Sequence, residues 1–185
     1  MSKLSAHEIR RRFESSKEFN EIFDAFEQAL HERLEDIELY RALFWNPSLS
    51  ADELCLFGEK IVIEFPGLAY DTYMWLANVF EVTYSTVDNY ERALEYYEKA
   101  SSVHPQESAP YLDAADCYEP DLNIPPLSSL INFLKAGIEQ VSNPKVLYER
   151  LSHLYDLDGN DEMSNFCRRK AEEGTEPPAQ QPSPG

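Results

Sequence analysis

The chain has 185 residues, of which 43% are hydrophobic and 27% charged, so it is long enough to bury one core and too short for two ordinary domains. Its 34 acidic and 16 basic residues give a formal net charge of -18 at pH 7, which argues against nucleic acid or an anionic membrane surface as a partner. The cysteines are widely spaced and form no CxxC pair, which favours reduced thiols and a cytoplasmic location over a disulfide framework. They are Cys55, Cys117 and Cys167.

No apolar run approaches the ~20 residues that cross a bilayer, and no apolar segment follows the basic residues near the N-terminus. We therefore expect neither a transmembrane helix nor a secretory leader. The last residues contain Gly, Pro, Ser and Gln but no large apolar side chain. This composition predicts a disordered, Pro-rich tail over 174–185, because nothing there offsets the entropy of ordering the chain.

Between the two ends, apolar residues recur at three- and four-residue spacing, the period of an α-helix, and nothing alternates with the period of a strand. Turn residues interrupt this pattern and predict about ten helices. Their expected ranges are 5–14, 17–34, 36–45, 51–64, 70–83, 88–103, 109–118, 126–141, 144–156 and 161–173. Ser5 with Glu8, and Ser50 with Glu53, have the spacing of N-terminal capping boxes. Three more caps are expected just before prolines, at Ser108, Asn123 and Asn143.

A motif of aromatic and small residues occurs three times between Tyr73 and Tyr155. It reads Tyr73-x-x-Leu76-Ala77-x-x-Phe80, then Tyr111-x-x-Ala114-Ala115-x-x-Tyr118, then Tyr148-x-x-Leu151-Ser152-x-x-Tyr155. A following helix carries small residues seven apart, at Ala93 and Ala100, Ser129 and Ala136, and Ser164 and Ala171. Two helices cross closely only where one offers a small side chain to a bulky one. We therefore expect Ala77, Ala115 and Ser152 at helix crossings.

The segment from Tyr90 to Pro105 adds Tyr97 between its two alanines and ends on proline. Together with the preceding aromatic and Leu-Ala motif, it resembles the two-helix unit of the tetratricopeptide repeat (TPR) family. The resemblance implies an all-α fold, a right-handed superhelix of stacked helical hairpins with about ten helices. A closed helical bundle is the alternative, because both architectures obey the same packing rules.

The resemblance covers roughly residues 36–173 and suggests a domain organisation. Residues 1–35 are expected to form an N-terminal hairpin or cap. A degenerate repeat follows at 36–69, where Ile61 replaces the small residue of the second helix. Three clearer repeats are expected at 70–107, 108–144 and 145–173.

In the TPR family, ligands lie against first-helix side chains that face a concave groove. Transferring those positions to this chain predicts a peptide-binding groove, whose members are called the predicted groove residues below. They are Asp71, Met74, Trp75, Asn78, Glu81, Leu112, Asp113, Asp116, Glu149 and His153. The set is acidic and contains the apolar anchors Trp75, Met74 and Leu112, so it favours a basic or amphipathic protein or peptide segment. Clamping a chaperone's C-terminal carboxylate is disfavoured, because Met74, Leu112 and Asp113 occupy positions that would need basic residues.

These features predict a non-enzymatic adaptor, scaffold or chaperone-like protein. A secretion-type chaperone with a specific cargo is an alternative, since such chaperones are similarly small, acidic and built from three TPR units. Acidity that serves only solubility, self-association through Trp75 and Met74, and an enzyme on a helical scaffold are further alternatives. A specific cleft holding carboxylates of shifted pKa would favour the enzyme.

The sequence contains no motif typical of catalysis, phosphate binding or metal binding. No phosphate-binding GxxxxGK[ST], GxGxxG or GxSxG pattern occurs, and the four histidines lie apart from one another and from the cysteines. The acidic loop after Asp156 has its glycine at the fourth position, where a calcium loop needs it at the sixth. We predict no catalytic residue, no cofactor and no metal site.

Overall fold

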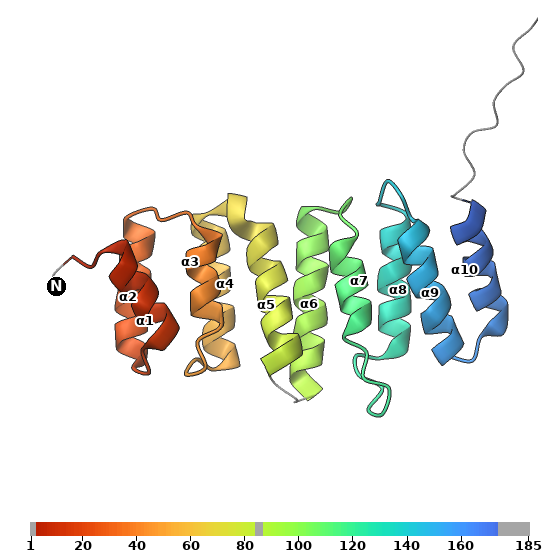
Figure 1. Ribbon diagram of the computed structural model, residues 1–185, viewed down its shortest axis with the longest axis horizontal. Coiled ribbons are helices and arrows are strands. Elements are labelled where there is room, and N and C mark those ends of the chain that lie inside the picture. Colours follow the sequence, from red (N-terminus) through yellow and green to blue (C-terminus); the bar gives the residue numbers. More distant parts are fainter. Residues whose placement is uncertain (1–2, 84–86, 174–185) are drawn as a thin grey trace, which may run out of the picture. The chain divides into compact units, whose positions relative to one another are not determined.

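The computed structural model describes residues 3–83 and 87–173, and the tail predicted to be disordered, 174–185, lies outside them. Over these residues the all-α prediction is confirmed, with ten α-helices and one short 3-10 helix (Figure 1). They are α1 (Ala6–Ser15), α2 (Phe19–His31), α3 (Ile37–Phe44), α4 (Ala51–Glu64), the 3-10 helix η1 (Pro66–Leu68), α5 (Ala69–Thr83), α6 (Val87–Val103), α7 (Ala109–Asp116), α8 (Leu127–Ile138), α9 (Lys145–Leu157) and α10 (Asp161–Glu173).

Local side-chain chemistry explains where several helices begin. Both capping boxes are confirmed: the Ser5 and Ser50 side chains accept hydrogen bonds from the third helical backbone N–H, and Glu8 and Glu53 accept bonds from the cap residues in return. Ser108 occupies the N-cap position of α7 as predicted, but it does not act as a cap. Its backbone is already in the α region and its side chain makes no capping hydrogen bond.

The other two predicted caps, Asn123 and Asn143, lie before the N-cap position, but their side chains still accept backbone hydrogen bonds from the first residue of the helix. Asn123 Oδ1 accepts from Leu127 N at 3.4 Å, and Asn143 Oδ1 accepts from Lys145 N at 3.2 Å. In both cases a proline occupies the N-cap position itself, Pro126 before α8 and Pro144 before α9.

Helix α2 ends three residues earlier than the sequence pattern predicted. Arg33 adopts a left-handed backbone with φ of 53°. Two backbone hydrogen bonds close the helix, from Arg33 N to Leu30 O and from Leu34 N to Ala29 O, both at 3.0 Å. This is a Schellman ending, which usually uses glycine. The Arg33 guanidinium lies over the ring of Phe65 at 4.6 Å, which helps to hold this conformation.

The chain divides into two compact units, one ending at His104 and one beginning at Pro105. In the first unit, α1 packs on α2 and α3, α5 packs on α3 and α4, and α5 and α6 form a hairpin. Aromatic rings fill its core. Tyr40 on α3 contacts Phe13, Phe26 and Phe65 at centroid distances of 6.4, 6.2 and 6.0 Å, and Phe26 contacts Phe57 at 4.6 Å.

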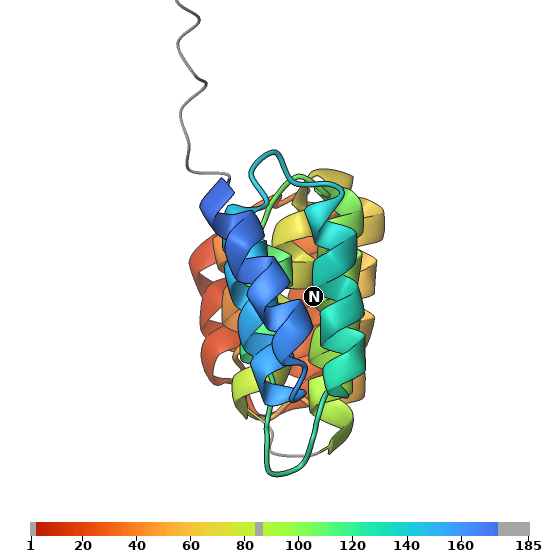
Figure 2. The ribbon, with the colours of Figure 1, turned by 90° about the vertical axis from the view of Figure 1, so that its right-hand side faces the viewer.

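The second unit contains α7–α10. Helix α8 packs on α7 and α9, and α9 packs on α7 and α10, the last two lying side by side in blue in Figure 2. Helix α9 also ends in a Schellman motif, here with Gly159 at φ of 72°. Asn160 N donates to Tyr155 O at 2.9 Å. The acidic loop singled out in the sequence is thus a helix-terminating turn.

The expected small residues are buried with two exceptions, Ser129, which is half-buried, and Ala136. Ala77, Ala115 and Ser152 are all buried, as are Ala93, Ala100, Ser164 and Ala171. Ala136, however, is exposed, and the small residue on the inner face of α8 is its neighbour Gly137, against the ring of Tyr111. The prediction was wrong by one position because the buried stripe of α8 runs through Leu127, Leu130 and Leu134 to Gly137.

Candidate functional site

The predicted groove residues fall on three helices in two units. Asp71, Met74, Trp75, Asn78 and Glu81 lie on α5 of the first unit, and Leu112, Asp113, Asp116, Glu149 and His153 lie on α7 and α9 of the second unit. All ten are half-buried or exposed. The helix crossings therefore bury other residues and leave these ten side chains in contact with solvent.

Helix α5 separates its residues clearly into two faces. Thr72, Leu76, Ala77 and Phe80 are fully buried, whereas the groove residues recur at three- and four-residue steps along the other side, which places them on one stripe. An acidic, partly apolar stripe thus remains on α5 after its core contacts are made.

Trp75 is the central aromatic group of this stripe, and a cation lies over it. The Arg41 guanidinium, on the neighbouring helix α3, is 5.2 Å from the Trp75 ring centroid, and its Nη1 is 2.9 Å from Glu38 Oε2. An arginine over an indole face is a favourable arrangement worth ~0.5–1 kcal/mol at exposed sites. The indole face is therefore already used to bind a cation.

Asn78 and Glu81 are held by helix α6 through one buried tyrosine. Asn78 Nδ2 donates to the Tyr97 hydroxyl at 3.3 Å, and this hydroxyl donates to Glu81 Oε2 at 2.9 Å. Asn78 also donates to the backbone oxygen of Met74 at 3.5 Å. The network fixes the orientation of two groove side chains and satisfies the Tyr97 hydroxyl, which would otherwise be buried without a partner.

In the second unit, basic residues of α9 pair with groove carboxylates. Arg150 forms an ion pair with Asp116, and Lys145 Nζ is 3.8 Å from Glu149 Oε1. His153 is exposed near the end of the same helix. Part of the negative charge that the sequence assigns to the groove is therefore neutralised within the unit.

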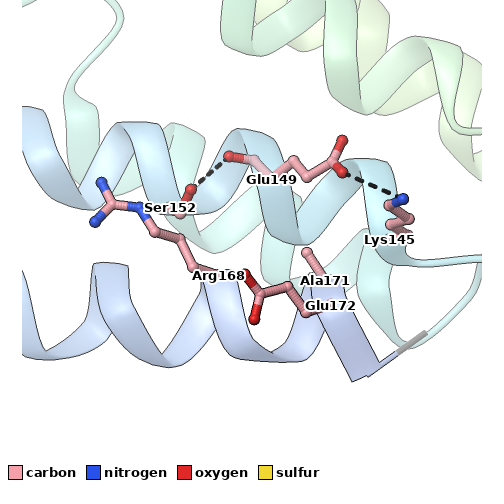
Figure 3. Close-up of a pocket in the computed structure, with 6 residues that line it drawn as sticks. All are labelled: Lys145, Glu149, Ser152, Arg168, Ala171 and Glu172. Carbon is pink, nitrogen blue, oxygen red and sulfur yellow. Dashed lines mark hydrogen bonds and ion pairs between the residues drawn. The ribbon is translucent and has the colours of Figure 1, made fainter. Parts of the chain in front are cut away.

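A cavity of about 280 Å³ lies between α9 and α10 and includes the predicted residue Glu149 (Figure 3). Buried Ser152 and Ala171 belong to its lining, and the Ser152 hydroxyl donates to the Glu149 backbone oxygen at 2.7 Å. The charged lining residues are Lys145, Glu149, Arg168 and Glu172. Two positive and two negative groups make this cavity electrically balanced, unlike the acidic groove expected from the sequence.

Neither a protein-family model nor a curated protein matches the sequence. Among solved structures, the chain is similar to two crystal structures of MamA, with TM-scores of 0.53 and 0.51, identities of 14% and 13%, and coverage of 91% and 94% of this chain and 89% and 96% of the other. It is also similar to TTC0263, a thermophilic TPR protein of Thermus thermophilus, with a TM-score of 0.50, 18% identity and 92% coverage of both chains.

The chain has a TPR-like fold. Its ten described helices form stacked hairpin pairs, as the motif resemblance implied. At these identities the likeness concerns the fold, so the binding properties of the TPR-like chain have to be argued from its own side chains.

Sequence reasoning missed the residues that hold the predicted groove in place. Arg41 was not singled out, and Tyr97 was interpreted only as a packing residue. The sequence signal was weak, because each acts on a residue of another helix.

A groove between α2 and α4 was also missed. It has a volume of about 620 Å³ and is lined mainly by apolar side chains, including Phe23, Leu56 and Ile63. Its signal was present in the sequence, since α4 carries apolar residues on more than one side. No cluster of three or more metal-binding side chains occurs among the residues that the structure describes, and within the same residues no helix is long and apolar enough to cross a membrane.

Proposed function

We propose that this TPR-like chain is a non-enzymatic protein-interaction scaffold that binds a basic or amphipathic peptide segment through the predicted groove residues of each unit. The observation that carries the proposal is the division of each first helix into two faces. Stacking buries one stripe and leaves an acidic, partly apolar stripe open to solvent. Such a surface can bind a segment through side chains without any reacting group.

Trp75 is the proposed anchor of the first unit, with Met74 beside it. Because Arg41 already lies over the Trp75 ring, a lysine or arginine of the bound segment would take over or extend this cation–π contact. In the second unit Leu112 supplies the apolar contact and Glu149 an exposed carboxylate. A cation of the segment that approaches Asp116 would compete with Arg150 for the same carboxylate.

The test is a selection of short random peptides displayed on phage with the full chain as bait. We expect selected sequences to combine Lys or Arg with aromatic or aliphatic residues, and to bind more weakly at ~0.3 M than at ~0.05 M salt, because screening weakens contacts between exposed charges. Trp75→Ala should lose at least tenfold in affinity for them, as a buried aromatic anchor does.

Trp45→Ala is the matched control, because Trp45 is an exposed tryptophan of the same unit outside the predicted groove. Its affinity should equal that of the unmodified chain. Selected peptides without basic residues, salt-independent binding, or equal losses in the two tryptophan variants would each contradict the proposal.

A further inference from the structure

The groove between α2 and α4 lies on residues that the first-helix surface does not use. Phe23, Phe26 and Glu27 line it from α2, and Cys55, Leu56, Lys60 and Ile63 are among the residues that line it from α4. Both walls belong to the first unit. Its volume of about 620 Å³ is within the range of protein ligand sites.

A cluster of rings makes the floor of this groove rigid. Phe57 lies 4.6 Å from Phe26 and 6.1 Å from Phe19, and Phe19 lies 5.9 Å from Phe23. Phe26 and Phe57 are buried, while Phe19 and Phe23 remain partly exposed. The aromatic surface is thus formed before any partner arrives, which reduces the ordering cost of binding.

Helix α4 has more apolar residues than its core contacts use. Leu54, Phe57 and Ile61 are buried, but Leu56 is 60% exposed and Ile63 is 71% exposed. Both line the groove together with the partly exposed ring of Phe23 on α2. Single exposed apolar residues are ordinary, whereas several gathered along one groove mark an interaction surface.

The charge around the groove selects the kind of partner. Helices α2 and α4 carry seven carboxylates and one lysine. The carboxylates are Glu21, Asp24, Glu27, Asp52, Glu53, Glu59 and Glu64, and the lysine is Lys60. Arg92, Lys99 and Lys60 form ion pairs with Asp52, Glu59 and Glu64, which leaves the three carboxylates of α2 outside these pairs. A second copy of this chain would bring the same acidic helices against this surface and would be repelled. A partner with basic residues beside its apolar face is attracted.

The length and lining of the groove suit a helix. From Asp52 to Ile63 the α4 wall covers about 16 Å at ~1.5 Å per residue, the length of three helical turns. Leu56, Lys60 and Ile63 follow one another at helical spacing along this wall, as ridges that pack between the side chains of another helix do.

We propose that the α2–α4 groove binds an amphipathic helix of a protein partner, with its apolar face on Phe23, Leu56 and Ile63 and its basic flank near Glu27. This binding does not depend on the predicted groove residues. The two surfaces would let the chain hold two segments at once.

The probe is a synthetic 18-residue peptide of Leu, Ala and Lys, with leucines on one helical face and lysines beside them. A peptide of the same composition with scrambled order and a version with Glu in place of Lys serve as controls. Affinity for the full chain is measured by titration calorimetry. Cys55 is a built-in reporter, because it lines the groove and is partly exposed while the other two cysteines are buried. Its alkylation rate is measured with and without peptide.

The groove variant is Leu56→Ser with Ile63→Ser. The matched control is Leu122→Ser with Leu157→Ser, which removes two apolar side chains of similar exposure, 56% and 46%, from the second unit. We expect the Leu-Lys peptide to slow alkylation of Cys55 in the unmodified chain, the control variant and Trp75→Ala, and to need an at least tenfold higher concentration for the same protection in the groove variant. The scrambled and Glu peptides should bind at least tenfold more weakly than the probe.

Equal binding of the scrambled peptide, or unchanged affinity in the groove variant, would overturn the inference. Loss of binding in Trp75→Ala alone would also overturn it, but would support the proposed function, so the two proposals fail separately. Sedimentation of the chain alone tests the remaining occupant. A dimer that dissociates in the groove variant would replace the partner helix with a second copy and overturn the choice made here.

Discussion

Gly137 offers the sharpest test of how the second unit is packed. A Cβ atom at this position would lie 2.7 Å from Tyr111 Cδ1, 2.8 Å from Cγ and 2.9 Å from Cε1. The Tyr111 ring has little room to move, because it is buried and its centroid is 4.7 Å from that of Phe133. The adjacent Ala136 is exposed on the same helix. Replacing each residue in turn with leucine therefore tests which of the two lies at the crossing of α8 with α7.

The expected cost follows from two opposing effects. Inserting carbon atoms into a packed crossing costs ~1–3 kcal/mol, and Gly137→Leu belongs at the upper end because its first added atom already overlaps three ring atoms. Leucine is favoured over glycine in a helix by about 0.8 kcal/mol. The variant should therefore lose ~2 kcal/mol of unfolding free energy, or ~4–8 °C in Tm for a chain of this length.

Urea unfolding followed by circular dichroism measures the loss, with Ala136→Leu as the matched control. An exposed substitution of this kind should stay within ~0.5 kcal/mol of the unmodified chain, and the dependence on urea should keep its slope in both variants. Equal stability of the two variants would refute the packing of α8 on Tyr111. A larger loss in Ala136→Leu would restore the register expected from the sequence motif.

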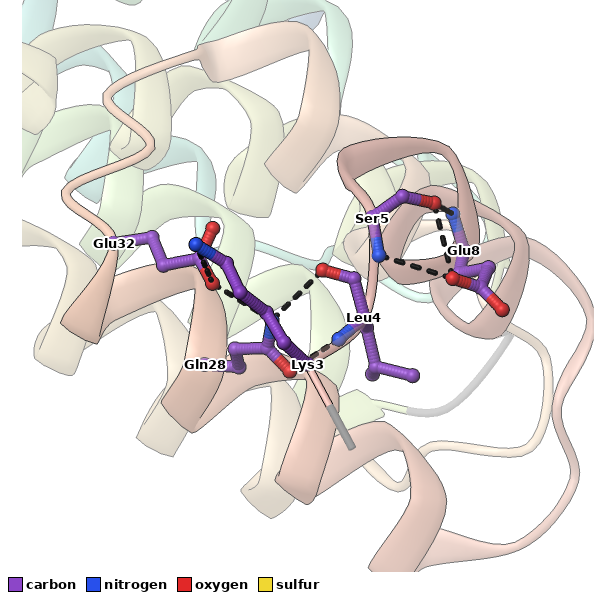
Figure 4. Close-up of polar contacts among 6 residues, drawn as sticks. All are labelled: Lys3, Leu4, Ser5, Glu8, Gln28 and Glu32. Carbon is purple, nitrogen blue, oxygen red and sulfur yellow. Dashed lines mark hydrogen bonds and ion pairs between the residues drawn. The ribbon is translucent and has the colours of Figure 1, made fainter. Parts of the chain in front are cut away.

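Two further outcomes depend on local chemistry. In the capping box at the start of α1, hydrogen bonds from the Ser5 backbone N–H and hydroxyl lower the pKa of Glu8 (Figure 4). The carboxylate therefore stabilises the fold above its unfolded pKa of about 4.3, and this contribution disappears as pH falls through the lower folded pKa. Ser5→Ala should raise the pKa of Glu8 in an NMR titration, and an unchanged value would contradict the capping box. Alkylation of the native chain should modify Cys55 first, because Cys117 and Cys167 are buried and burial raises the pKa of the Cys167 thiol. Mass spectrometry that found Cys167 modified as fast as Cys55 would show that α10 opens readily.

The features predicted correctly from the sequence are those encoded over a few residues. The two capping boxes need only a serine and a glutamate three positions apart. The helices themselves follow from apolar spacing within one segment. Contacts between segments could not be predicted in the same way. The Gln28 side chain, for example, donates one hydrogen bond to the backbone of Leu4 and accepts another from it, 24 positions away (Figure 4). The residues around Gln28 and Leu4 contain no pattern that predicts this contact.

The register of α8 shows a second limit. Ala136 and Gly137 are adjacent and both small, but only Ala136 lies seven residues after another small residue, Ser129, because the residue seven before Gly137 is Leu130. The motif therefore favours the residue that the structure leaves exposed. Which one meets α7 depends on the rotation of the helix, and the buried leucines fix that rotation. An adjacent pair of small residues therefore predicts a crossing but not its contact.

The candidate site was the hardest part to predict from the sequence, because its charged side chains pair with residues that are distant along the chain. Asp116 and Arg150 are 34 positions apart, and Tyr97 and Glu81 are 16 apart. A count of carboxylates along the first helices treats each as available, whereas ion pairs and hydrogen bonds already engage part of them. The acidity of the predicted groove is thus smaller than its composition suggests.

Helix α4 shows why a binding surface is difficult to predict from the sequence of one helix. In sequence, Leu54 and Leu56 are equivalent apolar residues two positions apart, and a two-residue step on a helix turns the side chain by about 200°. One of them consequently enters the core while the other cannot. The surface left uncovered by this geometry becomes a groove only because α2 presents Phe23 beside it. A binding surface of this kind arises from the packing of two helices, so neither helix predicts it alone.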